Sequence, residues 1–521
     1  MDTKVWVEMV LLQLREYCSG LKDNIYELDD VFRRYMENDE EYRNGQKERL
    51  AVEGLNIVHI YSQRKNYYYI MTFLLHATKS KEIYKELLRY SISDNSITKE
   101  SKYFLYNQFI CCNFLESDLA DGEIKDLLDD LYSHIYQAYK EEIAEEYEFI
   151  QKEDRNQDFV MVFVSQVLDM RHGPTKTLLD RCYMLEKFLN KKVYIVNTAE
   201  LLSKYQMINC FDAMGANYIE AYSDINHLSY KGKEFAFFQC PADMPQVSVI
   251  KEILDVVKSE KPYFILTIGG NSMVSDICSN IIPTITIGTV PSNRAVTRGQ
   301  FQTIGRKITE EDRKWMQKHH LAEDHIIESL FTSAFKEQKH HYTRRELGLP
   351  EDKFICILVG GRLDEEIDSD CMDMLQRLAD AGIYIAFIGV FNRYQKYADQ
   401  NETFRNNSIN LGFQDDVLAV DECCDLYINP KRIGGGTSAA EALYKGLPVV
   451  TFDFGDVGVG AGADFHVSGY EDMYNHIMKY VKDKEYYAEM STKARERAAC
   501  LTDSKTEFIK IIQKAEESDR F

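Results

Sequence analysis

The first 173 residues contain no proline, because all nine prolines lie at Pro174 or later. Glycine is also scarce there, and only four of the 27 glycines precede residue 151. This region therefore lacks the usual sequence signals for turns. Its apolar residues recur at helical spacing, as in Leu127, Leu131 and Ile135. We predict an all-helical domain over residues 1–152.

The chain also lacks long apolar runs. No stretch approaches the roughly 18 apolar residues of a membrane span, and the first residues include Lys4 and Glu8 where a secretory signal would be apolar. The 12 cysteines show neither metal-ligand nor disulfide-framework spacing. We expect a cytoplasmic protein with reduced thiols and no integral membrane segment.

Basic residues are in deficit, with 62 Lys/Arg against 84 Asp/Glu and a net charge of −22. An extended nucleic-acid backbone or an anionic membrane surface would be repelled overall, so no nucleic-acid partner is expected. Residues 1–150 hold 18 Lys/Arg and 29 Asp/Glu, a net charge of −11. The helical domain is therefore a distinct acidic unit, and local basic pockets stay open for the rest of the chain.

From residue 157 onward short apolar strands alternate with helical stretches, which is typical of parallel sheets built from βαβ units. The alternation stops at a polar connector and restarts near residue 354. We predict an α/β protein with two Rossmann-like domains over residues 153–340 and 341–487, followed by carboxy-terminal helices over 488–521. The expected strands are 159–165, 193–196, 235–238, 263–268, 284–287, 354–359, 383–388, 409–411, 425–428 and 448–451.

Ligands of open α/β sheets bind beyond the carboxyl ends of strands. Gly361 and Arg362 follow the first strand of the second half, where glycine lets a ligand approach and arginine offers a phosphate a bidentate fork. Gly412, Phe413 and Gln414 follow a later strand and offer backbone groups and a ring for a nucleobase. A plain strand-to-helix turn is the alternative for the first of these segments.

The third segment, residues 429–438, reads NPKRIGGGTS and opens a helical stretch. Its glycines expose backbone N–H groups at a helix amino terminus, which favours an anion. It lacks the Gly-Lys-Ser/Thr of a nucleoside-triphosphate loop and the spacing of the dinucleotide fingerprint. Glu441 lies one turn into the helix, at the distance of a ribose next to a bound diphosphate, although a solvated or capping glutamate is the alternative.

Together, the order of these segments from Leu347 to Thr451 resembles the carboxy-terminal domain of GT-B glycosyltransferases. The resemblance implies that Arg362 faces the diphosphate of a nucleotide sugar, that Glu441 binds the ribose, and that Phe413 and Gln414 lie at the base. It also assigns the loop to the diphosphate through Lys431, Arg432, Gly435, Gly436, Thr437 and Ser438.

The sequence departs from the retaining family-4 enzymes, which carry two glutamates eight positions apart. Glu441 supplies the second glutamate, but Ile433 stands in place of the first, and Glu365 and Glu366 stand where a lysine is usual. A helical domain ahead of two Rossmann halves looks more like the bacterial cytoplasmic protein glucosyltransferases that modify adhesins and the protein O-linked N-acetylglucosamine transferases.

This resemblance implies transfer of a hexose from a nucleotide-sugar donor, expected to be a UDP-sugar, to a protein or glycan acceptor. His172 precedes a helix after the first strand and is our candidate for a cleft base, with Arg362 stabilising the leaving diphosphate. No metal or other cofactor is expected. The alternatives are a catalytically silent GT-B partner or chaperone of an active glycosyltransferase, favoured by Ile433, and a sugar-nucleotide epimerase.

The helical domain offers no phosphate loop, and we assign it to acceptor recognition, with packing or homo-oligomerisation as the alternative. Tyr67, Tyr68 and Tyr69 are interpreted as packing surface rather than as a stacking platform.

Overall fold

The computed structural model describes residues 5–38, 40–61, 66–143, 148–170, 172–201, 208–214, 216–335 and 337–521. The chain forms two compact units. The first comprises residues 1–146, 199–217 and 241–251, and the second comprises 147–198, 218–240 and 252–521. The boundaries that the sequence predicts at residues 152, 340 and 487 stay predictions.

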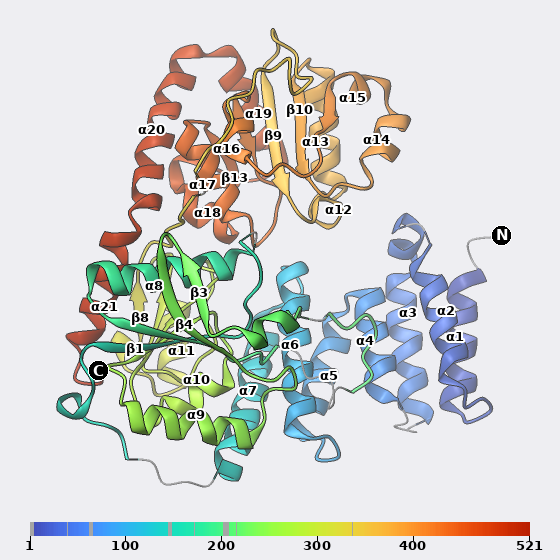
Figure 1. Ribbon diagram of the computed structural model, residues 1–521. Helices are drawn as coiled ribbons and strands as arrows, with labels where there is room; N and C mark the ends of the chain where they lie inside the picture. Colours follow the sequence, from blue (N-terminus) through green and yellow to red (C-terminus); the bar gives the residue numbers. More distant parts are fainter. Residues whose placement is uncertain are drawn as a thin grey trace. The chain divides into compact units, whose positions relative to one another are not determined.

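The amino-terminal part of the first unit is helical, as predicted. α1 contacts both α2 and α3, α3 contacts α4, and α4 contacts α5, while α7 contacts both α5 and α6 (Figure 1). None of the described helices is long and apolar enough to cross a bilayer. The helices are α1 (Val5–Cys18), α2 (Ile25–Met36), α3 (Glu40–Tyr61), α4 (Tyr67–Thr78), α5 (Lys81–Ser93), α6 (Lys99–Leu115) and α7 (Gly122–Ile143).

Local sequence explains where these helices begin and what they bury. Ser80 and Thr98 accept hydrogen bonds from backbone N–H groups in the first turns of α5 and α6, which caps both helices. Phe211, from a later segment of the same unit, packs edge-on against Phe73 with ring centroids 5.2 Å apart. Aromatic packing therefore ties a distant segment of the chain into the helical core.

The second unit contains an eight-stranded sheet of order β3-β4-β2-β1-β5-β6-β7-β8. All neighbours are parallel except β3 and β4, which form an antiparallel hairpin. Chain order reverses between β1 and β5. The strands are β1 (Phe159–Val164), β2 (Lys192–Asn197), β3 (His227–Tyr230), β4 (Lys233–Gln239), β5 (Ile265–Ile268), β6 (Thr284–Ile287), β7 (Phe301–Ile304) and β8 (Ile326–Glu328).

Four connections of this sheet contain α-helices, the usual way of joining parallel strands. Pro174 occupies the first turn of the first of these helices, where its missing N–H costs nothing. Ser272 caps another by accepting a hydrogen bond from the N–H of Ser275. The helices are α8 (Gly173–Phe188), α9 (Val247–Glu260), α10 (Met273–Cys278) and α11 (Glu310–Lys318).

A second, six-stranded sheet has the order β11-β10-β9-β12-β13-β14, and all its pairs are parallel. Its chain order reverses between β9 and β12. The strands are β9 (Ile355–Gly360), β10 (Tyr384–Gly389), β11 (Ser408–Asn410), β12 (Leu426–Ile428), β13 (Val449–Phe452) and β14 (His466–Val467). The sequence prediction of an all-α region and two Rossmann-like halves is confirmed.

Helices connect the strands of the second sheet, and three more follow its last strand. At the end, α20 (Lys484–Thr502) packs on α17, and α21 (Ser504–Glu516) packs on α8 and β8 of the first sheet (Figure 1). The other helices are α12 (Leu363–Glu366), α13 (Ser369–Asp380), α14 (Tyr394–Gln400), α15 (Glu402–Asn406), α16 (Val417–Asp421), α17 (Gly436–Lys445), α18 (Gly455–Ala461) and α19 (Tyr470–Lys482).

Candidate functional site

Two of the predicted segments flank the point where chain order reverses in the second sheet. Gly361 and Arg362 follow β9, and the glycine-rich loop follows the neighbouring strand β12. Such switch points open a crevice at the carboxyl ends of the strands, which is where ligands of this kind of sheet bind. An added Cβ at Gly361 would have no atom within 4 Å, so the backbone there is open to a ligand.

The glycine-rich loop leads directly into α17. Gly435 has φ +96°, a conformation that glycine adopts without strain, and it precedes the first helical residue, Gly436. Gly436, Thr437 and Ser438 form the first turn, whose N–H groups have no acceptor within the helix. Their partial positive charge makes this turn suited to an anion such as a diphosphate.

Arg432 supports this loop from beneath, and its side chain is only 4% exposed. Its guanidinium donates to the side chains of Asn429 at 2.8 Å, Tyr427 at 2.8 Å and Glu366 at 2.6 Å. A Cβ on Gly435 would lie 2.6 Å from Arg432 Nη2, so the glycine is needed for this packing. Arg432 thus supports the loop. The diphosphate contact that the resemblance implies for it stays untested.

The charge of Arg432 is also stabilised by its neighbours in this network. Burial opposes the guanidinium charge, but Tyr427 and Glu366 outweigh it and the pKa of Arg432 is raised. Tyr427 in turn shares a hydrogen bond of 2.8 Å with Ser438 in the first turn of α17. The hydroxyl of Ser438 therefore takes part in the supporting network, while Lys431 next to Arg432 is exposed.

Arg362 lies in the same cluster through a shared carboxylate. Its Nη2 donates to Glu366 Oε1 at 3.0 Å, while the other oxygen of Glu366 accepts from Arg432. The Arg362 side chain is 42% exposed, whereas that of Glu366 is 9% exposed. The two guanidinium groups thus share one carboxylate beside the loop.

Glu441 lies on α17, one turn beyond the loop, and is half-buried. Beneath it Asp421 ends α16 and is fully buried, and neither of its carboxylate oxygens has a hydrogen-bond partner among the residues that the structure describes. Burial, and then the charge of Glu441, raise the pKa of Asp421 well above its usual value. The protonated form of this carboxyl is therefore favoured beneath the residue predicted to bind the ribose.

Phe413 and Gln414 follow β11 in the predicted base loop. The Phe413 side chain is exposed, and the Gln414 amide donates to the carbonyl of Leu411 in its own loop at 2.8 Å. The ring is available to a nucleobase, whereas the Gln414 amide is turned back on the loop.

A small cavity of about 80 Å³ brings Thr437 together with residues of the first half. The first turn of α8 contributes Lys176 and Thr177, and the segment ahead of the second sheet contributes Thr332. The amino terminus of α8 and that of α17 thus face one space. Asp180, deeper in its wall, is buried and pairs with Arg181 at 2.7 Å.

His172 lies immediately before α8. Its Nδ1 is 2.9 Å from Thr175 Oγ1, which fixes the orientation of the ring. Burial lowers the pKa of His172, so the imidazole is neutral at neutral pH and able to accept a proton.

Asp456, on α18, links the loop to the first half. Its N–H donates to the carbonyl of Ile433 at 2.6 Å, and its carboxylate accepts from Ser292 N and Oγ at 3.2 and 2.8 Å. Burial raises the pKa of Asp456 to about 7, although Ser292 opposes the shift. Ile433, which stands where the retaining family-4 enzymes carry their first glutamate, is buried, so its side chain points into the protein interior.

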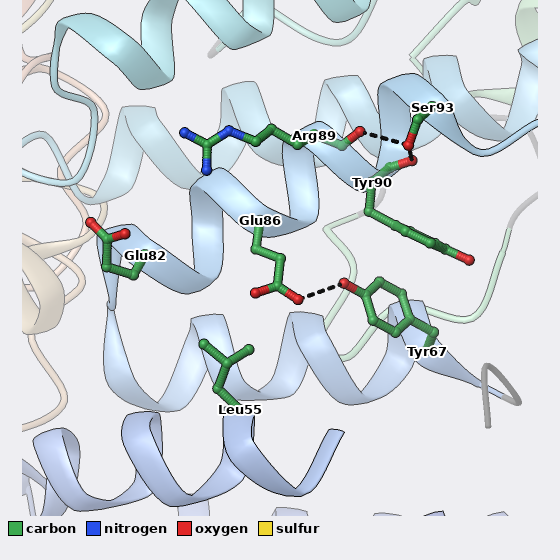
Figure 2. A pocket seen from close by; sticks show the side chains of 7 residues that line it. All are labelled: Leu55, Tyr67, Glu82, Glu86, Arg89, Tyr90 and Ser93. Atoms are coloured by element: carbon green, nitrogen blue, oxygen red, sulfur yellow. Dashed lines mark hydrogen bonds between the residues drawn. The ribbon is translucent and has the colours of Figure 1, made fainter. Parts of the chain in front are cut away.

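The helical unit carries a separate pocket of about 370 Å³ (Figure 2). Tyr67 and Tyr90 line it with ring centroids 4.2 Å apart, and the Tyr67 hydroxyl donates to Glu86 at 3.4 Å. Tyr68 and Tyr69 are buried, which confirms the packing interpretation for those two residues. The remaining lining residues are Leu55, Glu82, Arg89 and Ser93.

No protein-family model and no curated protein sequence matches the chain. Among solved structures, a mutant of the O-GlcNAc transferase of Thermobaculum terrenum aligns over 100% of this chain and 98% of its own, with a TM-score of 0.54 and 12% identity. The chain has the GT-B fold. At this identity the likeness shows the fold alone, with a helical region ahead of two Rossmann-like domains.

Two further structures align with part of the chain at lower scores. A glycosyltransferase from Rickettsia africae aligns over 70% of this chain and 100% of its own, with 11% identity and a TM-score of 0.47. HepE of Anabaena, in complex with UDP and glucose, aligns over 69% and 98%, with 13% identity and a TM-score of 0.43. The fold assignment rests on the Thermobaculum structure.

Several residues of the site escaped the sequence analysis. Lys176, Thr177, Asp421 and Asp456 carry no motif, and Glu366 was noted only as a departure from a pattern. Asp456 follows β13, so the rule of looking after strand ends would have found it. No sequence pattern marks Asp421, because its raised pKa results from burial beneath α17.

Proposed function

We propose that this protein is a glycosyltransferase that moves a hexose from a nucleotide-sugar donor, a UDP-sugar, to a protein or glycan acceptor. The observation that carries the proposal is the glycine-rich loop at the switch point of the second sheet. There the first turn of α17 faces a cavity shared with the first turn of α8. Helix amino termini favour anions such as the phosphate groups of a diphosphate.

In the proposed reaction the bond between the anomeric carbon and the β-phosphate oxygen breaks, and its electron pair goes to the diphosphate. The first turn of α17, with Arg362 and Lys431, stabilises that growing negative charge. The acceptor oxygen forms the new bond and loses a proton, for which His172 is the proposed base. Charge stabilisation in this scheme comes from the protein itself, so the proposal includes no metal ion.

Glu441 is proposed to bind the ribose and Phe413 the base. The Thermobaculum terrenum protein of the same fold is an O-GlcNAc transferase by name. This makes nucleotide-activated N-acetylglucosamine the first donor to test. The aromatic pocket of the helical unit is proposed to bind part of the acceptor.

A second candidate, a catalytically silent partner of an active glycosyltransferase, is favoured by one observation. Ile433 is buried where the retaining enzymes that the sequence resembles carry a glutamate. Such a protein would bind the nucleotide without turning over the sugar.

One assay separates the candidates. The purified protein is incubated with a panel of nucleotide sugars, and release of the nucleotide and the identity of the sugar are followed. A transferase slowly releases UDP by hydrolysis in the absence of acceptor, and an epimerase converts one sugar nucleotide into another. A silent partner does neither but binds UDP in calorimetry, and absence of UDP binding contradicts both GT-B proposals.

A further inference from the structure

Glu366 occupies an unusual place for an acidic residue. It ends α12, immediately after the strand whose end should meet the diphosphate, and its side chain is nearly buried. One oxygen accepts from Arg432 at 2.6 Å and the other from Arg362 at 3.0 Å. A carboxylate thus stands between the two arginines that the sequence assigns to an anion.

The two arginines differ in how firmly they are held. Arg432 is 4% exposed and donates to two side chains besides Glu366 and to the carbonyl of Val359 at 3.0 Å. Arg362 is 42% exposed and lies beside the open backbone of Gly361. An incoming anion can therefore draw Arg362 away, whereas Arg432 has to stay to support the loop.

From this geometry we infer that Glu366 is a positioning residue that competes with the donor diphosphate for Arg362. This inference rests on the proposed function. With the site empty, Glu366 neutralises part of the charge of two neighbouring guanidinium groups that would otherwise repel each other. When a diphosphate binds, Arg362 exchanges the carboxylate for phosphate oxygens, and Glu366 keeps its pair with Arg432.

If Glu366 competes with the diphosphate for Arg362, removing its charge should strengthen UDP binding rather than weaken it. Glu366→Gln keeps the size and one acceptor oxygen but removes the negative charge that retains Arg362. Breaking a partly exposed ion pair of this kind is worth about 0.2 to 1 kcal/mol, so UDP should bind roughly 1.4- to fivefold more tightly. Uridine, which has no phosphate, should bind as it does to the wild type. UDP should also raise the melting temperature of the variant more than that of the wild type, because it supplies the missing negative charge.

The test is a double-mutant cycle in the full-length protein, with UDP and uridine affinities measured by calorimetry. The cycle compares wild type, Glu366→Gln, Arg362→Gln and the double variant. We expect the gain in UDP affinity to vanish in the Arg362→Gln background, because the competition acts through that side chain. A purely structural role of Glu366 predicts a loss of affinity that persists in both backgrounds.

A fall or no change in UDP affinity for folded Glu366→Gln overturns the inference, while UDP binding by the wild type leaves the proposed function intact. Failure of the wild type to bind UDP contradicts the proposed function instead. If Glu366→Gln does not fold, Glu366→Asp replaces it in the cycle. Its shorter side chain stays with the buried Arg432 and releases Arg362, so the same gain in affinity is expected and its absence overturns the inference.

Discussion

Arg432 allows a sharp test of how the glycine-rich loop is held. In Arg432→Met the aliphatic part of the side chain is kept, while the guanidinium and its bonds to Glu366, Asn429 and Tyr427 are lost. Glu366 then keeps only its partly exposed pair with Arg362. Losing one partner of a buried ion pair costs up to about 3 to 5 kcal/mol. Because Tyr427 also holds Ser438, the first turn of α17 should loosen as well.

The matched control is Arg362→Met, which removes an arginine from the same carboxylate. Its side chain is 42% exposed, and exposed pairs contribute about 0 to 1 kcal/mol, so its stability should be close to that of the wild type. Calorimetric unfolding of the full chain gives the stabilities, and amide hydrogen exchange over residues 432–445 reports on the loop. Equal stability losses in the two variants, or unchanged exchange in Arg432→Met, would refute the supporting role.

Three further outcomes are expected. Glu441→Gln should weaken UDP binding roughly ten- to a hundredfold, because loss of a charged hydrogen bond costs about 1.5 to 3 kcal/mol. The control Glu485→Gln, on the exposed start of α20, should bind UDP normally in the same calorimetry. An aspartate has a pKa of about 4 in the unfolded chain, whereas the pKa of Asp456 in the folded protein is about 7. Between these pH values the folded state holds the extra proton, so the stability of the wild type should fall as the pH rises through this window. Thermal unfolding at about pH 5 and about pH 8 should therefore show a smaller loss for Asp456→Asn, and an identical loss would contradict the assignment. Tyr90→Ala should reduce transfer to the natural acceptor without changing hydrolysis of the nucleotide sugar. The control Tyr26→Ala, at an exposed ring of α2, should change neither rate. Normal transfer by Tyr90→Ala would exclude the pocket from acceptor binding.

The sequence predicted the strands of the two sheets where they are apolar and buried. It missed β3, β7, β8 and β14, which are short or lie at the sheet edges. The β3–β4 hairpin turns at Lys231 and Gly232, both with positive φ, a tight two-residue turn that favours glycine. A Lys-Gly pair is a weak signal for such a turn, because lysine rarely adopts that conformation.

The candidate site was predictable where it lies on loops that follow strands. Gly361, Arg362 and the glycine-rich loop are adjacent because β9 and β12 are neighbours in the sheet. The sequence could not predict that Arg432 supports the loop while Arg362 is the more exposed of the two arginines. This difference depends on the burial of one guanidinium beneath Gly435 and on a carboxylate 66 positions away in sequence from Arg432. Such three-dimensional pairing leaves no local pattern.

The most direct test of the account is a crystal structure of the protein with UDP bound. The account predicts the diphosphate at the first turn of α17, near Gly436 and Thr437, with Arg362 turned toward it and the ribose at Glu441. UDP bound away from this turn, or a diphosphate there with Arg362 still paired to Glu366 and the ribose remote from Glu441, would contradict it.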